Sequence, residues 1–142
     1  IVVLLGAMIP VGLAMETSGA AASITAPILA LQDSAPIWLI LMLLMAVTML
    51  MTDIMNNAAT AVLMAPIAIT LASGLGVSAD PLLMTVAVGA SSTYLTPIGH
   101  QSNLLVMGPG GYRFSDYWRM GLLLDLLILV VSVPLILLVW PL

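Results

Sequence analysis

The chain has 142 residues, of which 63% are hydrophobic and only 6% are charged, a composition typical of a membrane protein rather than of a soluble core. With two basic residues and a net charge of −4, it lacks the basic surface that nucleic-acid binding needs. The absence of cysteine excludes disulfides and thiolate metal sites.

The first predicted element covers residues 1–31, which are apolar apart from one short polar patch. That patch either sits at a membrane interface or divides the segment, so we expect one or two membrane helices here. A turn is predicted over 32–36, where polar residues and Pro36 interrupt the apolar run.

Residues 37–72 hold two uncharged apolar arms around a polar centre that contains Asn56 and Asn57. The arms, 37–51 and 61–72, are each shorter than the ~20 apolar residues that a helix needs to cross a bilayer. The chain could instead enter from one side, turn at mid-depth and return. Backbone at that depth is tolerated only where protein shields it or water reaches it. The pattern therefore predicts a re-entrant helical hairpin with an ion or solute site at its tip.

A second apolar region, 82–108, is interrupted by Pro97, Gly99 and the polar residues that follow as far as Asn103. Such an interruption within an apolar region predicts a discontinuous helix. The last predicted element is a transmembrane helix over 114–140. Its first residues, 114–119, are aromatic and basic and predict an interface anchor, and 120–140 predict the clearest complete span. The expected fold class is an all-α membrane protein with a re-entrant hairpin and a broken helix.

Both polar breaks have the same electrostatic layout. The helix before a break ends in free carbonyls, which suit a hard cation, and the helix after it begins with free N–H groups, which suit an anion. Neutral amides and hydroxyls at the breaks can bind an anion and its co-ion without burying a permanent charge. The structural alternative is that Asn57 merely caps a helix starting at Ala58, and that Pro97 and Gly99 merely kink a helix.

Three ionisable residues in the apolar regions are each open to a functional and a structural interpretation. Asp53 is either a coupling carboxylate or a hydrogen-bonded residue at the hairpin bend, and the structural role is favoured. His100 is a proton carrier, a substrate donor or a hydrogen-bonded loop residue. Asp125 lies within the last predicted span, where acids are functional suspects, but its nearness to Arg119 favours a structural partner.

The residues around the two breaks resemble the divalent anion–sodium symporters, the family of sodium–sulfate and sodium–dicarboxylate transporters. The run 56–66 reads Asn-Asn-Ala-Ala-Thr-Ala-Val-Leu-Met-Ala-Pro and resembles that family's hairpin tip. The run 99–108 reads Gly-His-Gln-Ser-Asn-Leu-Leu-Val-Met-Gly and resembles its loop, and 114–121 resembles the entry into its last helix.

The resemblance implies that the chain is the C-terminal half of an inverted-repeat transporter, which works with an N-terminal repeat of the same protein and forms a homodimer. It implies Na⁺ as coupling ion, a small divalent anion as substrate and the lipid bilayer as surroundings. The loop looks most like bacterial members with TrkA-C-type regulatory domains, so we expect a multi-pass protein of the bacterial inner (plasma) membrane.

The family's tip asparagine maps to Asn57 and its tip-proximal hydroxyl to Thr52. The expected Na⁺ residues are Thr52, Asn57, Thr60, Gly99 and His100. The expected substrate residues are Asn56, Asn57, Ala58, Ser102 and Asn103. In this chain Asn56 and Ala58 replace two hydroxyl residues of the family tip. This loss favours a compact tetrahedral anion such as sulfate over a long dicarboxylate.

Other function classes are weighed against this one. A carrier of arsenite or metal–citrate, or a proton-coupled carrier, would share the polar breaks. Among non-transporting membrane subunits, a passive anchor would not need them, whereas a packing subunit is compatible with them. An intramembrane enzyme could use Asp53 and His100, but the sequence has no nucleophile elbow and no His-Glu-x-x-His motif. We expect no enzyme.

Overall fold

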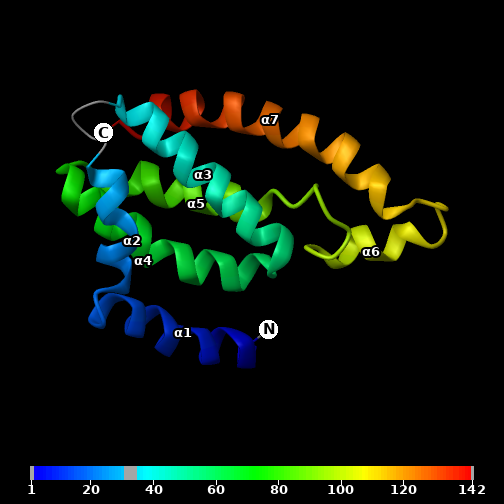
Figure 1. Ribbon diagram of the computed structural model, residues 1–142, viewed down its shortest axis with the longest axis horizontal. Coiled ribbons are helices and arrows are strands. Elements are labelled where there is room, and N and C mark those ends of the chain that lie inside the picture. The colour runs from blue at the N-terminus through cyan, green and yellow to red at the C-terminus, as the bar shows by residue number, and fades with distance from the viewer. Residues whose placement is uncertain (1, 31–34, 142) are drawn as a thin grey trace.

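The computed structural model describes residues 2–30 and 35–141, and this part of the chain is helical without any strand (Figure 1). The prediction of an all-α protein is confirmed. The predicted turn over 32–36 lies outside the described residues except for its last two. The helices are α1 (Val2–Thr17), α2 (Ala20–Leu29), α3 (Ile37–Ile54), α4 (Asn57–Leu75), α5 (Ala79–Ser91), α6 (Gln101–Met107) and α7 (Phe114–Val139).

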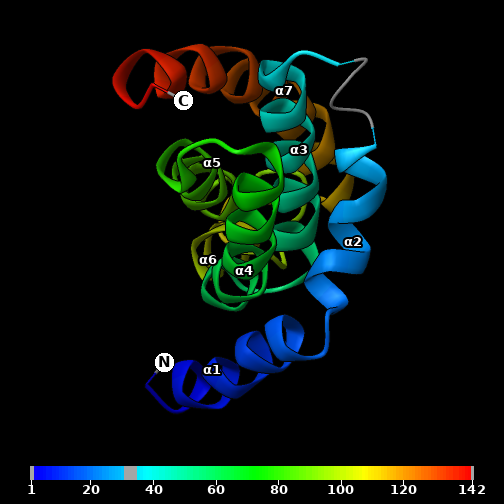
Figure 2. The same cartoon turned by 90° about the vertical axis from the view of Figure 1, so that its left-hand side faces the viewer.

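Helices α3, α4 and α5 form the centre of the molecule, where α5 packs against both of the others. Helix α7 packs against α3 and α5, whereas α1 and α2 pack against α4. In both views α7 and α1 lie on opposite sides of the central helices (Figures 1 and 2). The buried core includes Leu41, Leu44, Met45, Leu71, Leu82 and Val86.

Small residues let the central helices approach closely. A methyl group on Gly89 of α5 would lie 3.0 Å from the Thr48 side chain and 3.2 Å from the Met45 carbonyl oxygen of α3. The Thr48 hydroxyl is also satisfied within its own helix, because it donates to the Leu44 carbonyl at 2.7 Å. Close packing of this kind holds helices together in lipid, where apolar burial gives no net advantage.

In the described part of the chain, three helices are long and apolar enough to cross a membrane: α3 with 18 residues, α4 with 19 and α7 with 26. The expectation that each hairpin arm is too short to span was therefore wrong. The helices extend beyond the uncharged runs, so that Thr52 and Asp53 still lie in α3 and Asn57 is already in α4. The polar centre consists of two helix ends joined at Met55 and Asn56 rather than of a loop.

Helix α5 ends at Ser91, and the chain becomes helical again only at Gln101. The irregular stretch 92–100 between them is called the break below. Pro97 accounts for part of it, because proline disfavours helical backbone at the preceding residue. The following α6 has only seven residues.

Candidate ion and anion site

Four oxygen atoms, from α3, α4, α5 and the break, converge at the end of the α3–α4 hairpin. The Asn57 side-chain carbonyl accepts hydrogen bonds from the Thr52 and Thr93 hydroxyls, both at 3.0 Å. The Thr52 hydroxyl also lies 2.9 Å from the Ala90 carbonyl oxygen and 3.5 Å from the Thr93 hydroxyl. We call Thr52, Asn57, Thr93 and the Ala90 carbonyl the tip cluster.

The tip cluster has more acceptors than protons. Each threonine hydroxyl carries one proton, so Thr52 cannot donate fully to Asn57 and to Ala90 at the same time. Thr52 and Thr93 are buried, with 0% and 3% of their surface exposed. A buried group of neutral oxygens short of donors is chemically suited to a hard cation, which prefers oxygen ligands.

Gly99 brings the break into direct contact with the hairpin. A methyl group at this position would lie 2.8 Å from the Thr52 backbone carbonyl oxygen, 3.1 Å from the Asp53 Cα and in overlap with the Thr93 side chain. Only glycine fits such an approach without a shift of the backbone. The predicted contact between the hairpin tip and the second break is therefore present, and Gly99 lies beside the tip cluster.

Hydrogen bonds to Asp53 connect the break to the end of α3. Its carboxylate Oδ1 accepts from the Leu95 N–H at 3.2 Å, and its backbone carbonyl accepts from the Thr96 hydroxyl at 2.7 Å. The Thr96 hydroxyl accepts in turn from the Gly99 N–H at 3.3 Å. These contacts support the structural role that the sequence favoured for Asp53.

Asn103 joins α6 to the break and to α7. Its side-chain N–H group donates to the Thr93 carbonyl at 2.9 Å and to the Thr96 carbonyl at 3.4 Å. Its own backbone carbonyl accepts from the Tyr117 hydroxyl at 2.7 Å. Asn103 thus contacts the tip cluster through the backbone carbonyl of Thr93.

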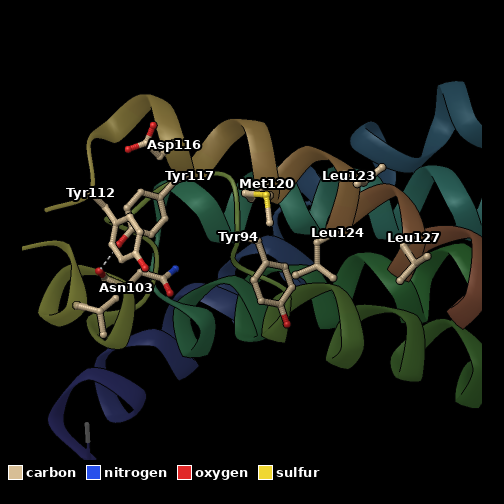
Figure 3. Close-up of a pocket in the computed structure, with 11 residues that line it drawn as sticks. Tyr94, Asn103, Tyr112, Asp116, Tyr117, Met120, Leu123, Leu124 and Leu127 are labelled. Carbon is tan, nitrogen blue, oxygen red and sulfur yellow. Dashed lines mark hydrogen bonds between the residues drawn. The ribbon is translucent and has the colours of Figure 1, made fainter. Parts of the chain in front are cut away.

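Asn103 also lines a cavity of about 550 Å³ alongside α7 (Figure 3). Tyr112, Tyr117 and Asn103 lie together at one end, whereas Leu124 and Leu127 lie toward the other. The complete lining is Tyr94, Asn103, Val106, Tyr112, Asp116, Tyr117, Met120, Gly121, Leu123, Leu124 and Leu127. The cavity is polar at the α6 end and apolar along α7.

The remaining predicted site residues are not drawn into the tip cluster. Asn56 is exposed and caps α4, since its side chain accepts from the Ala59 N–H at 2.8 Å. His100 is exposed and caps α6, since its Nδ1 accepts from the Ser102 N–H at 3.2 Å. Ser102 is exposed, and Ala58 offers only backbone groups. The helix-cap alternative thus applies to Asn56, one residue before Asn57.

Four buried side-chain oxygens in the described part of the chain have no hydrogen-bond partner. One is the Thr60 hydroxyl, on the same helix as Asn57. The others are Oδ2 of Asp53 and both carboxylate oxygens of Asp125. The structural partner expected for Asp125 near Arg119 is not observed. Among the described residues, no group of three or more acidic or histidine side chains forms a metal site.

Thr93 and Tyr117 were not predicted as site residues. Thr93 follows two serines at the end of an apolar run, and that change from apolar to hydroxyl residues was the available signal. Tyr117 was part of a segment interpreted only as an interface anchor. Its hydrogen bond to Asn103 depends on how α7 folds back, which no local pattern reveals.

Comparison with known proteins relates the whole chain to transporters. The sequence profile described as "Citrate transporter" matches residues 1–142. An uncharacterized transporter of Synechocystis is 36% identical over 99% of this chain, which spans 23% of that protein. The sodium-dependent high-affinity dicarboxylate transporter 3 of Caenorhabditis elegans is 31% identical over 71% of the chain and 18% of its own length. The probable sodium/sulfate cotransporter 3 of Chlamydomonas reinhardtii is 27% identical over 60% of the chain and 10% of its own length.

These matches confirm the resemblance found from the two motif runs. The matched profile and relatives are named as transporters rather than as enzymes, which confirms the non-enzymatic interpretation. Together with three membrane-capable helices, they identify a segment of an integral membrane protein. The chain spans less than a third of the length of the curated relatives it matches.

Proposed function

Because the chain belongs to the citrate transporter family, we propose that the complete protein is a sodium-coupled secondary transporter of a small divalent anion, sulfate or a dicarboxylate. The observation that carries this proposal is the tip cluster, a buried set of neutral oxygens where two helix ends meet the break. Relatives named for sodium-dependent dicarboxylate transport and sodium/sulfate cotransport support the choice of ion and anion.

The proposed Na⁺ ligands are Thr52 and Asn57, with Thr93 and the Ala90 carbonyl as additions from the structure. The residues fit the ion because they offer uncharged oxygens and a shortage of protons. The predicted Gly99 contribution is supported by the contact of its backbone with Thr52. When bound, Na⁺ would compensate the negative charge of the anion.

The other two predicted Na⁺ residues have different support. Thr60 remains a candidate because its hydroxyl is buried and has no partner in the described part of the chain. His100 is exposed, and its Nδ1 is engaged in the helix cap. We therefore propose for His100 a role in shaping the break rather than in binding the ion.

The proposed anion contacts lie at the start of α4 and in the first turn of α6. Asn57 and Ala58 begin α4 and contribute backbone N–H groups at the positive end of its dipole. Asn56, Ser102 and Asn103 would supply neutral donors around the same space. No lysine or arginine occurs at the hairpin end or in the break, so the anion charge must be balanced by the helix dipole, the amides and Na⁺.

For the membrane arrangement we propose a re-entrant α3–α4 hairpin with its tip at Asn56, within one half of an inverted-repeat transporter of the bacterial inner membrane. The support is not the length of the arms but the burial of Thr52, Asp53 and Thr60 around the hairpin end. Polar groups at a membrane surface would not need such shielding. The second half-site would come from the N-terminal repeat, and the assembly would be a homodimer.

The test is uptake of labelled sulfate, succinate and citrate by the full-length protein in proteoliposomes, driven by either a Na⁺ or a pH gradient. Na⁺-driven uptake of sulfate or succinate is the expected result, and competition between the two ranks them. Uptake driven only by the pH gradient, or of citrate alone, would favour the proton-coupled or metal–citrate carrier instead. No uptake of any of the three by correctly inserted protein would contradict the function.

A further inference from the structure

Asp125 is a buried acid without a hydrogen-bond partner in the described part of the chain. It lies in α7, which is long and apolar enough to cross a membrane, and only 8% of its surface is exposed. Neither carboxylate oxygen has a hydrogen-bond partner among the described residues, and each exposes less than 1 Å². An ionised carboxylate in this situation would be strongly unfavourable, because neither water nor a partner offsets its desolvation.

A second buried acid lies nearby. Gly121 of α7 packs against the backbone of Tyr94 and Leu95, and a methyl group on it would be 2.8 Å from the Leu95 nitrogen. The same nitrogen donates to Oδ1 of Asp53. Asp125 follows Gly121 by one helical turn on the same face of α7, so it lies in the part of α7 that packs against the break, where Asp53 is bonded.

The two carboxyl groups differ in what the structure gives them. Asp53 accepts one backbone N–H, a contact that favours the ionised form, and its Oδ2 is left without a partner. Asp125 accepts nothing. Two ionised carboxyl groups buried in one helix interface are far less stable than one charged and one neutral carboxyl group.

The other ionisable groups around Asp125 do not offset this. Helix α5 carries only Asp80, in its first turn, and on α7 the charged residues Asp116 and Arg119 lie near the helix start. The break contributes Tyr94, which lines the cavity, and the exposed His100. In the described part of the chain no cationic side chain is placed to compensate Asp125.

We infer that Asp125 is a proton-binding site, which holds a proton in the packed state shown here and lets α7 sit against the break beside Asp53. A proton needs no cavity, whereas any larger cation would need space around oxygens that expose less than 1 Å². The protonated acid is neutral and carries an O–H donor that its ionised form lacks. Loss of the proton to water would leave a second buried charge and loosen α7 from the break.

This inference rests on the proposed transport function only for its kinetic readout. Na⁺-driven uptake by the wild type should fall at alkaline pH, by up to about tenfold per pH unit once Asp125 gives up its proton. Asp125→Asn is permanently uncharged, so it should keep at alkaline pH the rate it has at acidic pH. The matched control is Asp80→Asn, the same change at an exposed acid, which should retain the wild-type pH profile.

A measurement on the purified full-length protein is independent of transport. Infrared difference spectra between acidic and alkaline pH should show the band of a protonated carboxyl group in the wild type and in Asp80→Asn. The band should be missing in Asp125→Asn. If this variant does not fold, the titration of the wild-type band with isotope-labelled aspartate still decides the question.

Three outcomes would overturn the inference. One is a wild-type protein without a protonated carboxyl band in the pH range where it is folded. Another is a band that disappears on addition of Na⁺ at constant pH, which would indicate a cation site in place of a proton. The third is an Asp125→Asn variant with an unchanged pH profile. Absence of transport together with the expected infrared band would instead contradict the proposed function alone.

Discussion

The candidate site has an inner half, formed by Thr52, Asn57 and Thr93, and an outer half, formed by Asn56 and His100. The two halves differ in how firmly the fold holds them. Thr52 and Thr93 of the tip cluster are buried and share the Asn57 side chain as acceptor. On the outer half, Asn56 and His100 are exposed, and each satisfies only the N–H groups of the helix that it begins. All five are polar residues at or beside the hairpin end or the break, yet only Thr52, Asn57 and Thr93 contact one another.

This difference teaches that proximity to a break does not by itself make a binding residue. The inner three come from α3, α4 and the break, so their meeting depends on tertiary structure. The outer two make contacts within two or three residues of themselves, which any helix start can offer. Substitutions should therefore impair ion activation on the inner side and mainly stability on the outer side.

The largest effect is expected for Asn57→Ala. Its removal leaves the buried Thr93 hydroxyl without its 3.0 Å acceptor, whereas Thr52 keeps the Ala90 carbonyl, and an unsatisfied buried polar group costs about 1–3 kcal/mol. The apparent Na⁺ affinity of uptake should fall by about tenfold or more, as ~1.4 kcal/mol corresponds to tenfold. The control is Asn56→Ala. Equal Na⁺ affinity in both variants, at equal expression, would contradict the distinction between the halves.

Gly99→Ala should come next, with a loss in both stability and transport. The added methyl group must push against the Thr52 carbonyl and the Thr93 side chain, and overpacking of this kind costs about 1–3 kcal/mol. Thermal unfolding in detergent and Na⁺-driven uptake measure the two losses. Gly108→Ala, where nothing lies within 4 Å of the new methyl group, is the matched control. A fully stable, fully active Gly99→Ala would show that the break does not touch the tip in the working protein.

Thr93→Val should have a more selective effect. Valine keeps the branched shape and removes one hydroxyl of the tip cluster, so the apparent Na⁺ affinity should fall about fivefold, roughly the value of one hydrogen bond. Ser91→Ala is the control, because its hydroxyl bonds only within α5. An unchanged Na⁺ dependence would remove Thr93 from the proposed ligands and leave it as a structural residue.

Tyr117→Phe tests whether α7 positions the anion residue Asn103. The variant loses the 2.7 Å hydrogen bond to the Asn103 carbonyl, so the KM for the anion should rise severalfold, by about 1 kcal/mol, while Na⁺ activation stays unchanged. Tyr112→Phe is the control from the same aromatic pair. If both kinetic constants move together in Tyr117→Phe, the bond is only structural.

The smallest functional effect is expected for His100→Ala. It removes the cap of a seven-residue helix, a loss of about 1 kcal/mol in local stability, and should leave Na⁺ affinity within about twofold of the wild type. Uptake measured against Na⁺ concentration checks this. A large loss of Na⁺ activation would restore His100 to the ion site predicted from the sequence.

Much of the inner half could be predicted from the sequence. Thr52 and Asn57 are five residues apart across the hairpin end, and their pairing followed from the resemblance of the tip run. Thr93 could not be predicted, because its distance from Asn57 along the chain is 36 residues and depends on where α5 ends. Local hydrophobic patterns carry no information about such long-range contacts.

The lengths of the elements were the weakest part of the prediction. The predicted arms ended at residue 51 and resumed at residue 61, which left Thr52 and Asn57 in the polar centre, whereas the helices include both residues. Helical hydrogen bonds satisfy the backbone there, so polar side chains at buried helix ends need not interrupt the helix. For the same reason the N-cap of α4 is Asn56, one residue before the Asn57 cap that the structural alternative named.

The contact at Gly121 has a mechanical consequence. Here the backbone of α7 is in direct contact with the backbone of Tyr94 and Leu95, with no side chain between them. Two surfaces fitted this closely cannot slide along each other unless they first separate. While this contact is intact, the start of α7, the break and the hairpin end should therefore move as one rigid piece, and bending must occur farther along α7 or outside this segment.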